Sequence, residues 1–242
     1  MSNDTNNTTI VGSTDQGSGV DNRTYRLLGV AFLIQATASA VSGLVLAPVD
    51  LLATTAPSDM VSTMADIAAN EWRLRASIVG EMITAGGVVA LGSLLFTVLR
   101  AHGRNVALIA FGLYVVEAAV LVVREVMVFA LFWTSQEAGA AVDGAEQFTT
   151  QASMLYESQS FAYSLHTLLF AAGATMFYIL FARSGVLPRP LIGLGLIAAP
   201  LALVSQTLVL FGVAVPLVFF LPNLPFELGA GLWLAFRPRP ST

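Results

Sequence analysis

An apolar run that nevertheless carries three charged side chains, residues 105–134, is the feature that most constrains this chain. At about 1.5 Å of rise per residue, a helix of this length can cross a hydrocarbon core of roughly 30 Å. The charges within it are Glu117, Arg124 and Glu125. A charged side chain that faces lipid at depth is costly. We therefore expect this helix to lie inside a bundle, with its charges facing other helices.

Composition and spacing predict an all-α membrane protein with six transmembrane helices in one bundle. Charged residues make up only 11% of the chain, against about 25% in a typical soluble domain, and the mean hydropathy is +0.76. Six apolar segments each supply roughly the 20 residues that a spanning helix needs. The expected spans are residues 27–49, 76–99, 105–134, 160–182, 191–211 and 218–236.

The arginines predict the orientation of these spans. One side of the six-span topology carries Arg23, Arg26, Arg100, Arg104, Arg183, Arg189, Arg237 and Arg239. The opposite loops are acidic. Because basic residues concentrate in cytoplasmic loops, we expect a multi-pass protein of the cell membrane with both termini in the cytoplasm. Residues 1–24 then form a disordered tail, since they have few apolar residues to bury. Residues 25–238 form the transmembrane domain and residues 239–242 a C-terminal tail.

The two long loops are expected on the external side. In residues 57–72, Met60, Met64 and Ile67 share one helical face, which predicts a short surface helix packed on the membrane or on the bundle. Ser58 is the expected N-cap, and an irregular loop is the alternative. Residues 135–157 are expected to continue the third and fourth spans as partly helical extensions.

Polar side chains on several spans fall at a similar depth when the rise per residue is counted along each helix. They lie in the outer half of the membrane, while the inner half is almost wholly apolar. We therefore expect a polar pocket within the bundle, open to the outside or buried just below it. Its candidate residues are Glu81, Glu117, Arg124, Tyr163, His166, Gln206, Asn223 and Glu227, with Glu125 and Gln35 as weaker candidates. If all its carboxylates were ionised the pocket would be strongly negative, so we expect a protonated carboxyl or a bound cation there.

Simpler roles for the same residues remain open. Arg124 could pair with Glu81 or Glu117 and only hold helices in register. Glu125 could face water at the membrane interface. His166 could only form a hydrogen bond with a neighbouring helix, and Gln35 could do the same.

The residue inventory excludes several chemistries. The chain has no cysteine, so disulfides and thiol nucleophiles are absent. It also has no lysine for a Schiff base. Its two histidines, one of them in a loop, do not suit bis-histidine haem, and no zinc-protease or phosphate-loop motif occurs. A net charge of −4 is not typical of a nucleic-acid-binding protein. We expect no cofactor, no metal site and no nucleic-acid partner.

Several stretches carry a resemblance to a known family. They are residues 25–46, 94–121, 165–196 and 225–236, and their most diagnostic parts are Leu165-His166, Leu187-Pro188-Arg189 and the Glu-Leu-x-x-Gly-Leu-Trp run that starts at Glu227. The chain resembles the prokaryotic membrane family catalogued as domain of unknown function 4386. This resemblance implies a six-helix integral membrane protein of bacteria or archaea and places Glu117, His166 and Glu227 in family-like segments. It implies no activity.

Three functions are consistent with the sequence. We expect a binding or sensory bundle whose pocket takes a lipid-like or small polar ligand, and we expect this rather than an enzyme. The first alternative is a small proton-coupled carrier or intramembrane enzyme that uses the buried carboxylates. The second is a structural bundle whose charges serve only helix assembly. A homodimer remains open, because six helices are few for a carrier.

Overall fold

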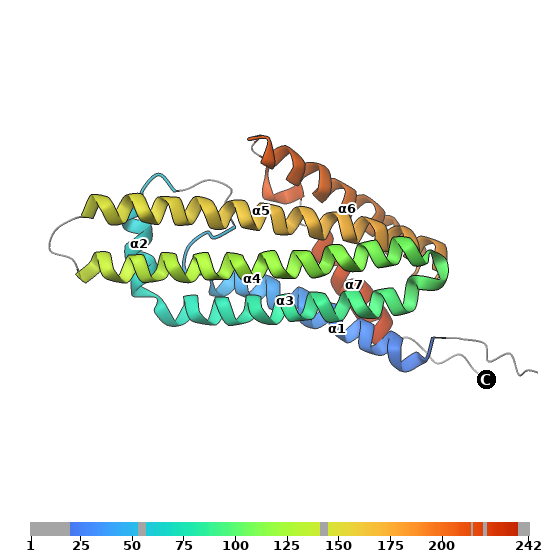
Figure 1. Ribbon diagram of the computed structural model, residues 1–242. Helices are drawn as coiled ribbons and strands as arrows, with labels where there is room; N and C mark the ends of the chain where they lie inside the picture. The colour runs from blue at the N-terminus through green and yellow to red at the C-terminus, as the bar shows by residue number, and fades with distance from the viewer. Residues whose placement is uncertain (1–19, 53–56, 141–144, 214, 220–221, 237–242) are drawn as a thin grey trace, which may run out of the picture.

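The computed structural model describes residues 20–52, 57–140, 145–213, 215–219 and 222–236, and the regular structure in these ranges is helical (Figure 1). In chain order the elements are α1 (Asn22–Val41), the π-helical turn η1 (Ser42–Leu46), α2 (Met60–Ala69), α3 (Glu71–Leu99), the 3₁₀ turn η2 (Arg100–His102), α4 (Arg104–Ala140), α5 (Ala145–Ser184), α6 (Arg189–Leu210), the 3₁₀ turn η3 (Leu217–Phe219) and α7 (Asn223–Ala235). The expected tails lie mostly outside the described residues, although α1 already begins within the first of them.

Helices α4 and α5 form the long axis of the molecule and run side by side (Figure 1). They contain 37 and 40 residues, which at about 1.5 Å per residue gives each roughly 55–60 Å. This is well beyond the thickness of a hydrocarbon core. The expectation that residues 135–157 extend the third and fourth spans as helix is confirmed for the described part, because α4 ends at Ala140 and α5 begins at Ala145.

Five helices in the described residues are long and apolar enough to cross a membrane, as in an integral membrane protein. They correspond to the first five expected spans. The sixth differs, because α7 has only 13 residues and so measures about 20 Å. Proline explains the shortening: Pro216 and Pro222 precede α7 and Pro225 lies in its first turn, and proline cannot donate the backbone hydrogen bond that a continuing helix requires.

The first long loop contains the short helix α2, which crosses the bundle near the end where α4 stops (Figure 1). Its expected apolar face, Met60, Met64 and Ile67, is buried against α4 and α5 in a cluster with Phe132. The face therefore packs on the bundle.

The expected N-cap of α2, Ser58, is wrong. Asp59 caps the helix, and its carboxylate accepts a hydrogen bond of 3.0 Å from the backbone N–H of Ser62. A cap side chain must reach the second or third helical N–H, and Ser58 lies one residue too early. The hydrogen bonds from Ser62 to the Asp59 carboxylate lower the pKa of Asp59 below its usual value of 3.8.

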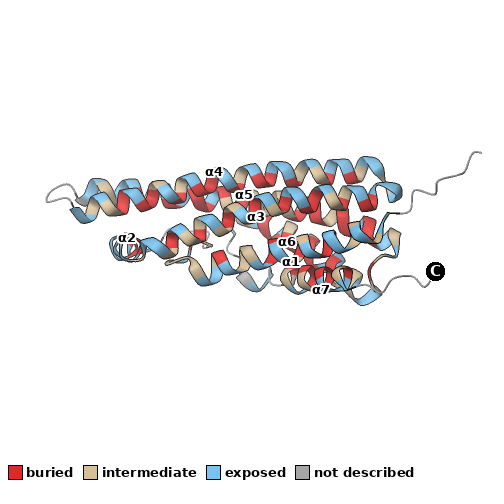
Figure 2. Ribbon diagram, turned by 90° about the horizontal axis from the view of Figure 1, so that it is seen from below, coloured by how far each residue is buried: buried red, intermediate tan, exposed pale blue. Residues whose placement is uncertain are grey.

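The buried apolar residues of the bundle form two clusters, and a layer of polar residues lies between them. One cluster lies under α2 and includes Ile67, Leu74 and Phe132. The larger one joins α1 and α3–α7 around residues such as Phe32 and Tyr114. Figure 2 shows buried positions gathered where helices face one another and exposed positions on their outer sides. Many of the exposed residues are large and apolar, as expected for helices that face lipid.

Helices α1 and α7 approach closely at Gly29. A Cβ atom at this position would lie 2.4 Å from the backbone nitrogen of Ala235 and 2.6 Å from the carbonyl oxygen of Gly231. Only glycine permits this contact between backbones, in the way that small residues commonly do between membrane helices. The contact helps to fix α7 against α1, and α7 supplies three residues of the candidate site.

Candidate functional site

A cavity of about 190 Å³ lies in the middle of the bundle. Its walls come from α1, η1, α3, α4, α5, α6 and α7, so residues far apart in the sequence surround one space. The lining residues are Gln35, Ala36, Ser39, Ala40, Gly43, Leu44, Leu52, Glu81, Thr84, Glu117, Tyr163, His166, Thr167, Phe170, Ala202, Asn223, Leu224 and Glu227.

Most of the residues expected in the pocket from the sequence lie around this cavity. They are Gln35, Glu81, Glu117, Tyr163, His166, Asn223 and Glu227. Three others do not line it, namely Gln206, Arg124 and Glu125. Gln206 is buried in α6, at 3% exposure, outside the cavity wall. Arg124 and Glu125 lie in a separate cluster next to Tyr163.

The start of α7 brings two of these residues to the cavity. The side-chain amide of Asn223 donates to the carbonyl oxygen of Ala198 in α6, at 3.4 Å. Glu227 follows four residues later and therefore lies on the same face of α7. Because α7 is short and begins at Asn223, its N-terminus lies at the level of the cavity.

Glu117 and His166 are two titratable lining side chains that lie close together. His166 Nδ1 lies 3.5 Å from Glu117 Oε1. The Glu117 side chain is 1% exposed, and the imidazole is 13% exposed. The pair joins α4 to α5 at the cavity wall.

Two buried oxygen atoms at the cavity, like Nδ1 of His166, have no hydrogen-bond partner among the described residues. They are Oε2 of Glu117 and Oε1 of Gln35, whose residues are 1% and 6% exposed. A buried acceptor without a partner costs about 1–3 kcal/mol. Such atoms are unusual in folded proteins and call for an explanation.

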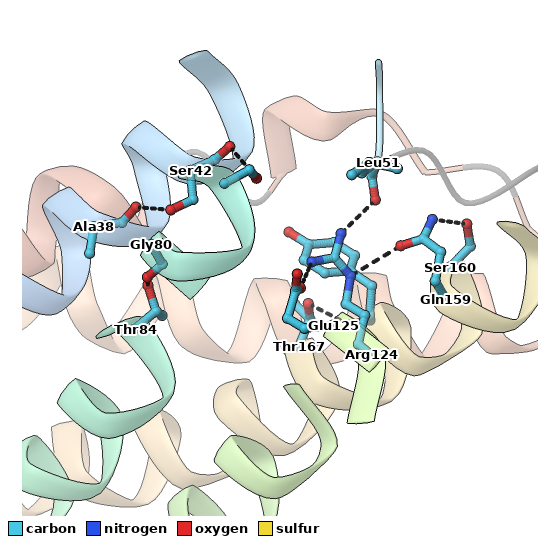
Figure 3. Close-up of polar contacts among 12 residues, drawn as sticks. Ala38, Ser42, Leu51, Gly80, Thr84, Arg124, Glu125, Gln159, Ser160 and Thr167 are labelled. Carbon is cyan, nitrogen blue, oxygen red and sulfur yellow. Dashed lines mark hydrogen bonds and ion pairs between the residues drawn. The ribbon is translucent and has the colours of Figure 1, made fainter. Parts of the chain in front are cut away.

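Arg124, by contrast, has partners on every side of its guanidinium group (Figure 3). Nη1 donates to Glu125 Oε1 at 2.7 Å, Nη2 to the carbonyl oxygen of Leu51 at 3.0 Å, and Nε to Oε1 of Gln159 at 3.1 Å. The guanidinium carbon also lies 5.0 Å from the centre of the Tyr163 ring, a distance typical of a cation–π contact.

These contacts decide two alternatives that the sequence leaves open for the charges of α4. Arg124 pairs with neither Glu81 nor Glu117. Glu117 is two turns away, about 10 Å along the helix axis, and Glu81 is near enough to attract Arg124 electrostatically without contact. Glu125 does not face water, because it is 4% exposed and is the ion-pair partner of Arg124.

Segment 47–52 connects this ion-pair cluster to the cavity. The carbonyl oxygen of Leu51 is held by Arg124, and the carbonyl oxygen of Asp50 accepts a hydrogen bond from the Tyr156 hydroxyl. The next residue, Leu52, lines the cavity. A contact made by α4 and α5 therefore positions part of the cavity wall.

The π-helical turn η1 positions a further part of the wall. Two carbonyl groups of this turn accept hydrogen bonds from side chains of α3, and that of Ser42 also accepts one from the backbone N–H of Ala47. Ser77 Oγ donates to the carbonyl of Ser42 at 3.0 Å, and Arg73 Nη2 donates to the carbonyl of Val45 at 2.9 Å. Gly43, in the same turn, lies at the cavity.

Residues that sequence reasoning left out of the site include Gln159, Thr84 and Thr167. Gln159 is 0% exposed and bridges Arg124 to Ser160. Its spacing was the available signal, because Gln159 lies four residues before Tyr163 and so shares a helix face with it. Thr84 and Thr167 line the cavity, but their hydroxyls donate to carbonyl groups of their own helices. Nothing in their local sequence distinguishes them from other helical threonines.

The lining carboxylates do not converge on one point. Within the described residues, no group of three or more His, Asp or Glu side chains is arranged to hold a metal ion. The acidic groups instead come from α3, α4 and α7 and surround the cavity from different sides. This arrangement suits contacts to several atoms of one molecule.

Comparison with known proteins gives a family. Residues 21–237 match the family model described as Domain of unknown function (DUF4386). The chain belongs to this family. The match covers all of the DUF4386 protein that forms the bundle and the cavity, and it confirms the resemblance seen in the sequence. No curated protein and no solved structure matches the chain.

Proposed function

We propose that this DUF4386 protein is a six-span membrane protein whose central cavity binds a small polar ligand, in a binding or sensory role. The observation that carries the proposal is the unpartnered carboxylate oxygen of Glu117 at the wall of a cavity of about 190 Å³. Buried polar groups inside a membrane protein are costly and commonly mark functional sites.

The contrast between two sets of buried charges supports this role over a purely structural one. Charges that only assemble helices are expected to be paired, and Arg124 and Glu125 meet that expectation. The ion pairs in the described part of the chain do not include Glu81 or Glu227. Carboxylates beside a cavity and without an ion-pair partner are available to a ligand.

The proposed membrane topology has both ends of the helical region in the cytoplasm, with η3 and α7 together making the sixth crossing. The arginine distribution supports it, because Arg100, Arg104, Arg183 and Arg189 lie in or next to the two short connections α3–α4 and α5–α6. The cavity then lies in the outer half of the membrane.

Cysteine labelling tests this topology, since the chain has no native cysteine. Ala101→Cys lies in η2 between α3 and α4, and Ala140→Cys lies at the end of α4; both positions are exposed. In intact cells a membrane-impermeant maleimide should label only the cysteine at position 140. Labelling at position 101 alone would invert the topology.

The binding function is tested with Glu117→Gln and Glu227→Gln in the full chain, purified in detergent. Mass spectrometry of extracted small molecules and the thermal unfolding temperature are compared with wild type. We expect a co-purified molecule to be lost from the variants and its stabilisation of the wild type to disappear with it. Glu137→Gln is the control, because Glu137 is an exposed carboxylate on the same helix as Glu117. If both cavity variants retain the wild-type molecules and stability, the cavity does not have this role.

A proton-coupled carrier is the second candidate, and the Glu117–His166 contact favours it. A carboxyl and an imidazole 3.5 Å apart are close to the distance at which a proton can pass between them. Reconstituted vesicles with an internal pH dye test this role. A carrier would move protons when its substrate is added and would lose that flux in Glu117→Gln. A binding protein would show no flux with either form.

A further inference from the structure

Most of the ionisable groups that line the cavity are carboxyl groups. Glu81, Glu117 and Glu227 line it, and the other titratable lining groups in the described residues are Tyr163 and His166. No described arginine lines the cavity, and the sequence contains no lysine. The protein therefore supplies three carboxylates to this space without a lining arginine or lysine.

The nearest buried cation does not neutralise these carboxylates. Arg124 is already bound to Glu125, to Gln159 and to a backbone carbonyl, and one face of its guanidinium lies over Tyr163. Together with Glu125 it forms a pair without net charge. The N-terminus of α7 adds a partial positive charge of about half a unit at most, which is small beside three carboxylates.

The unpartnered atoms define what a ligand must offer. Oε2 of an ionised Glu117 and Oε1 of Gln35 accept hydrogen bonds, so a hydrogen-bond donor complements both, and Nδ1 of His166 is a further unpartnered atom at the cavity. A cationic donor is favoured over a neutral one, because hydrogen bonds that involve charged partners are roughly twice as strong as neutral ones.

The spread of the carboxylates over three helices favours a molecule over a single ion. The described residues place no three acidic or histidine side chains where they could hold one metal ion. Phe170, Leu224 and Ala36 provide apolar wall between the polar groups. The cavity of about 190 Å³ is smaller than the roughly 300–1,000 Å³ of sites for drug-sized ligands, which suits a smaller compound.

We propose that the ligand of the cavity is a small organic ammonium ion, whose N–H groups donate to Glu117 and Gln35 and whose carbon chain packs against Phe170 and Leu224. The inference rests on the proposed binding function and names its ligand class. Glu81 and Glu227 provide the remaining negative charge. A quaternary ammonium ion carries the charge but no N–H donor, so it should bind more weakly than a primary amine of the same size.

Calorimetric titration of the full chain in non-ionic detergent at pH 7 tests the inference with four probes of similar size. They are n-butylammonium, tetramethylammonium, n-butanol and butyrate. We expect n-butylammonium to bind most tightly and Glu117→Gln to weaken it about 10- to 100-fold, the loss of one charged hydrogen bond. Glu137→Gln should bind like wild type, and Glu81→Gln provides a second cavity variant should Glu117→Gln be poorly folded.

Equal binding of n-butanol or butyrate would overturn the inference, and so would the absence of binding by every probe. The two proposals fail differently. If Glu117→Gln loses a co-purified molecule while the ammonium probes do not bind, the cavity is a binding site for another class of ligand. If no molecule is lost and no probe binds, the binding function fails as well.

Discussion

Replacing Arg124 by methionine tests whether its ion pair stabilises the bundle. The guanidinium is 3% exposed and donates to Glu125, Gln159 and the Leu51 carbonyl. Methionine keeps much of the side-chain length and removes every donor. Leaving a buried charge without its partner costs about 3–5 kcal/mol, and the unpaired carbonyl of Leu51 adds about 1 kcal/mol or more.

The assay is denaturant unfolding in detergent micelles, followed by tryptophan fluorescence. Arg75→Gln is the matched control, because Arg75 pairs with Glu71 at the same distance of 2.7 Å but with side chains 52% and 51% exposed. An exposed pair of this kind contributes about 0–1 kcal/mol. The difference between the two variants measures the effect of burial on an otherwise similar ion pair.

The double variant Arg124→Met with Glu125→Gln separates lost pairing from lost packing. Removing the second charge relieves the uncompensated carboxylate, so the double variant should be more stable than Arg124→Met alone by about 2 kcal/mol or more. If Arg124→Met destabilises no more than Arg75→Gln, or if the second change adds a further loss, Arg124 does not act as a buried partner of Glu125.

Two further predictions concern packing and pH. Gly29→Ala should lower the free energy of unfolding by about 1–3 kcal/mol or more, because the added methyl group meets backbone atoms of α7. The control Gly112→Ala should have little effect or stabilise α4, because no atom lies within 4 Å of its added carbon. Equal effects of the two variants would contradict the α1–α7 contact. The pKa of Asp59 is lowered in the folded protein, so its contribution to stability is present above the usual value of 3.8 and is lost as pH falls through the folded pKa. The stability difference between wild type and Asp59→Ala should therefore shrink between pH 6 and pH 3, and a constant difference over that range would argue against a charged cap.

The depth of a residue along a membrane-spanning helix can be calculated from the sequence, because the rise per residue is nearly constant. Counting along α4, α5 and α7 brings Glu117, His166 and Glu227 to a similar depth, and the structure has all three around one cavity. Counting residues does not show which side chains at the same depth contact one another. Partner choice depends on how each helix is rotated and tilted, and these are set by packing over the whole bundle.

Arg124 illustrates this limit. Two of its acceptors are side chains that a sequence pattern can place on helices, but the third is the carbonyl of Leu51, in an irregular segment. A backbone acceptor has no sequence signature. The prolines near α7 illustrate a related limit, because they predict an irregular start for the sixth span without specifying where the helix resumes.

The residue at which α7 begins links the local sequence to the proposed function. Had the sixth span been a full-length helix, its backbone donors near Asn223 would have been used within the helix. Because α7 begins at Asn223, its N-terminus lies at the cavity, and its first two turns carry both Asn223 and Glu227 to the wall. Membrane proteins tolerate an interrupted helix where the break is enclosed by protein or lines a cavity. The prolines that shorten α7 and the unpartnered oxygen of Glu117 are thus independent observations that favour the same space as the binding site.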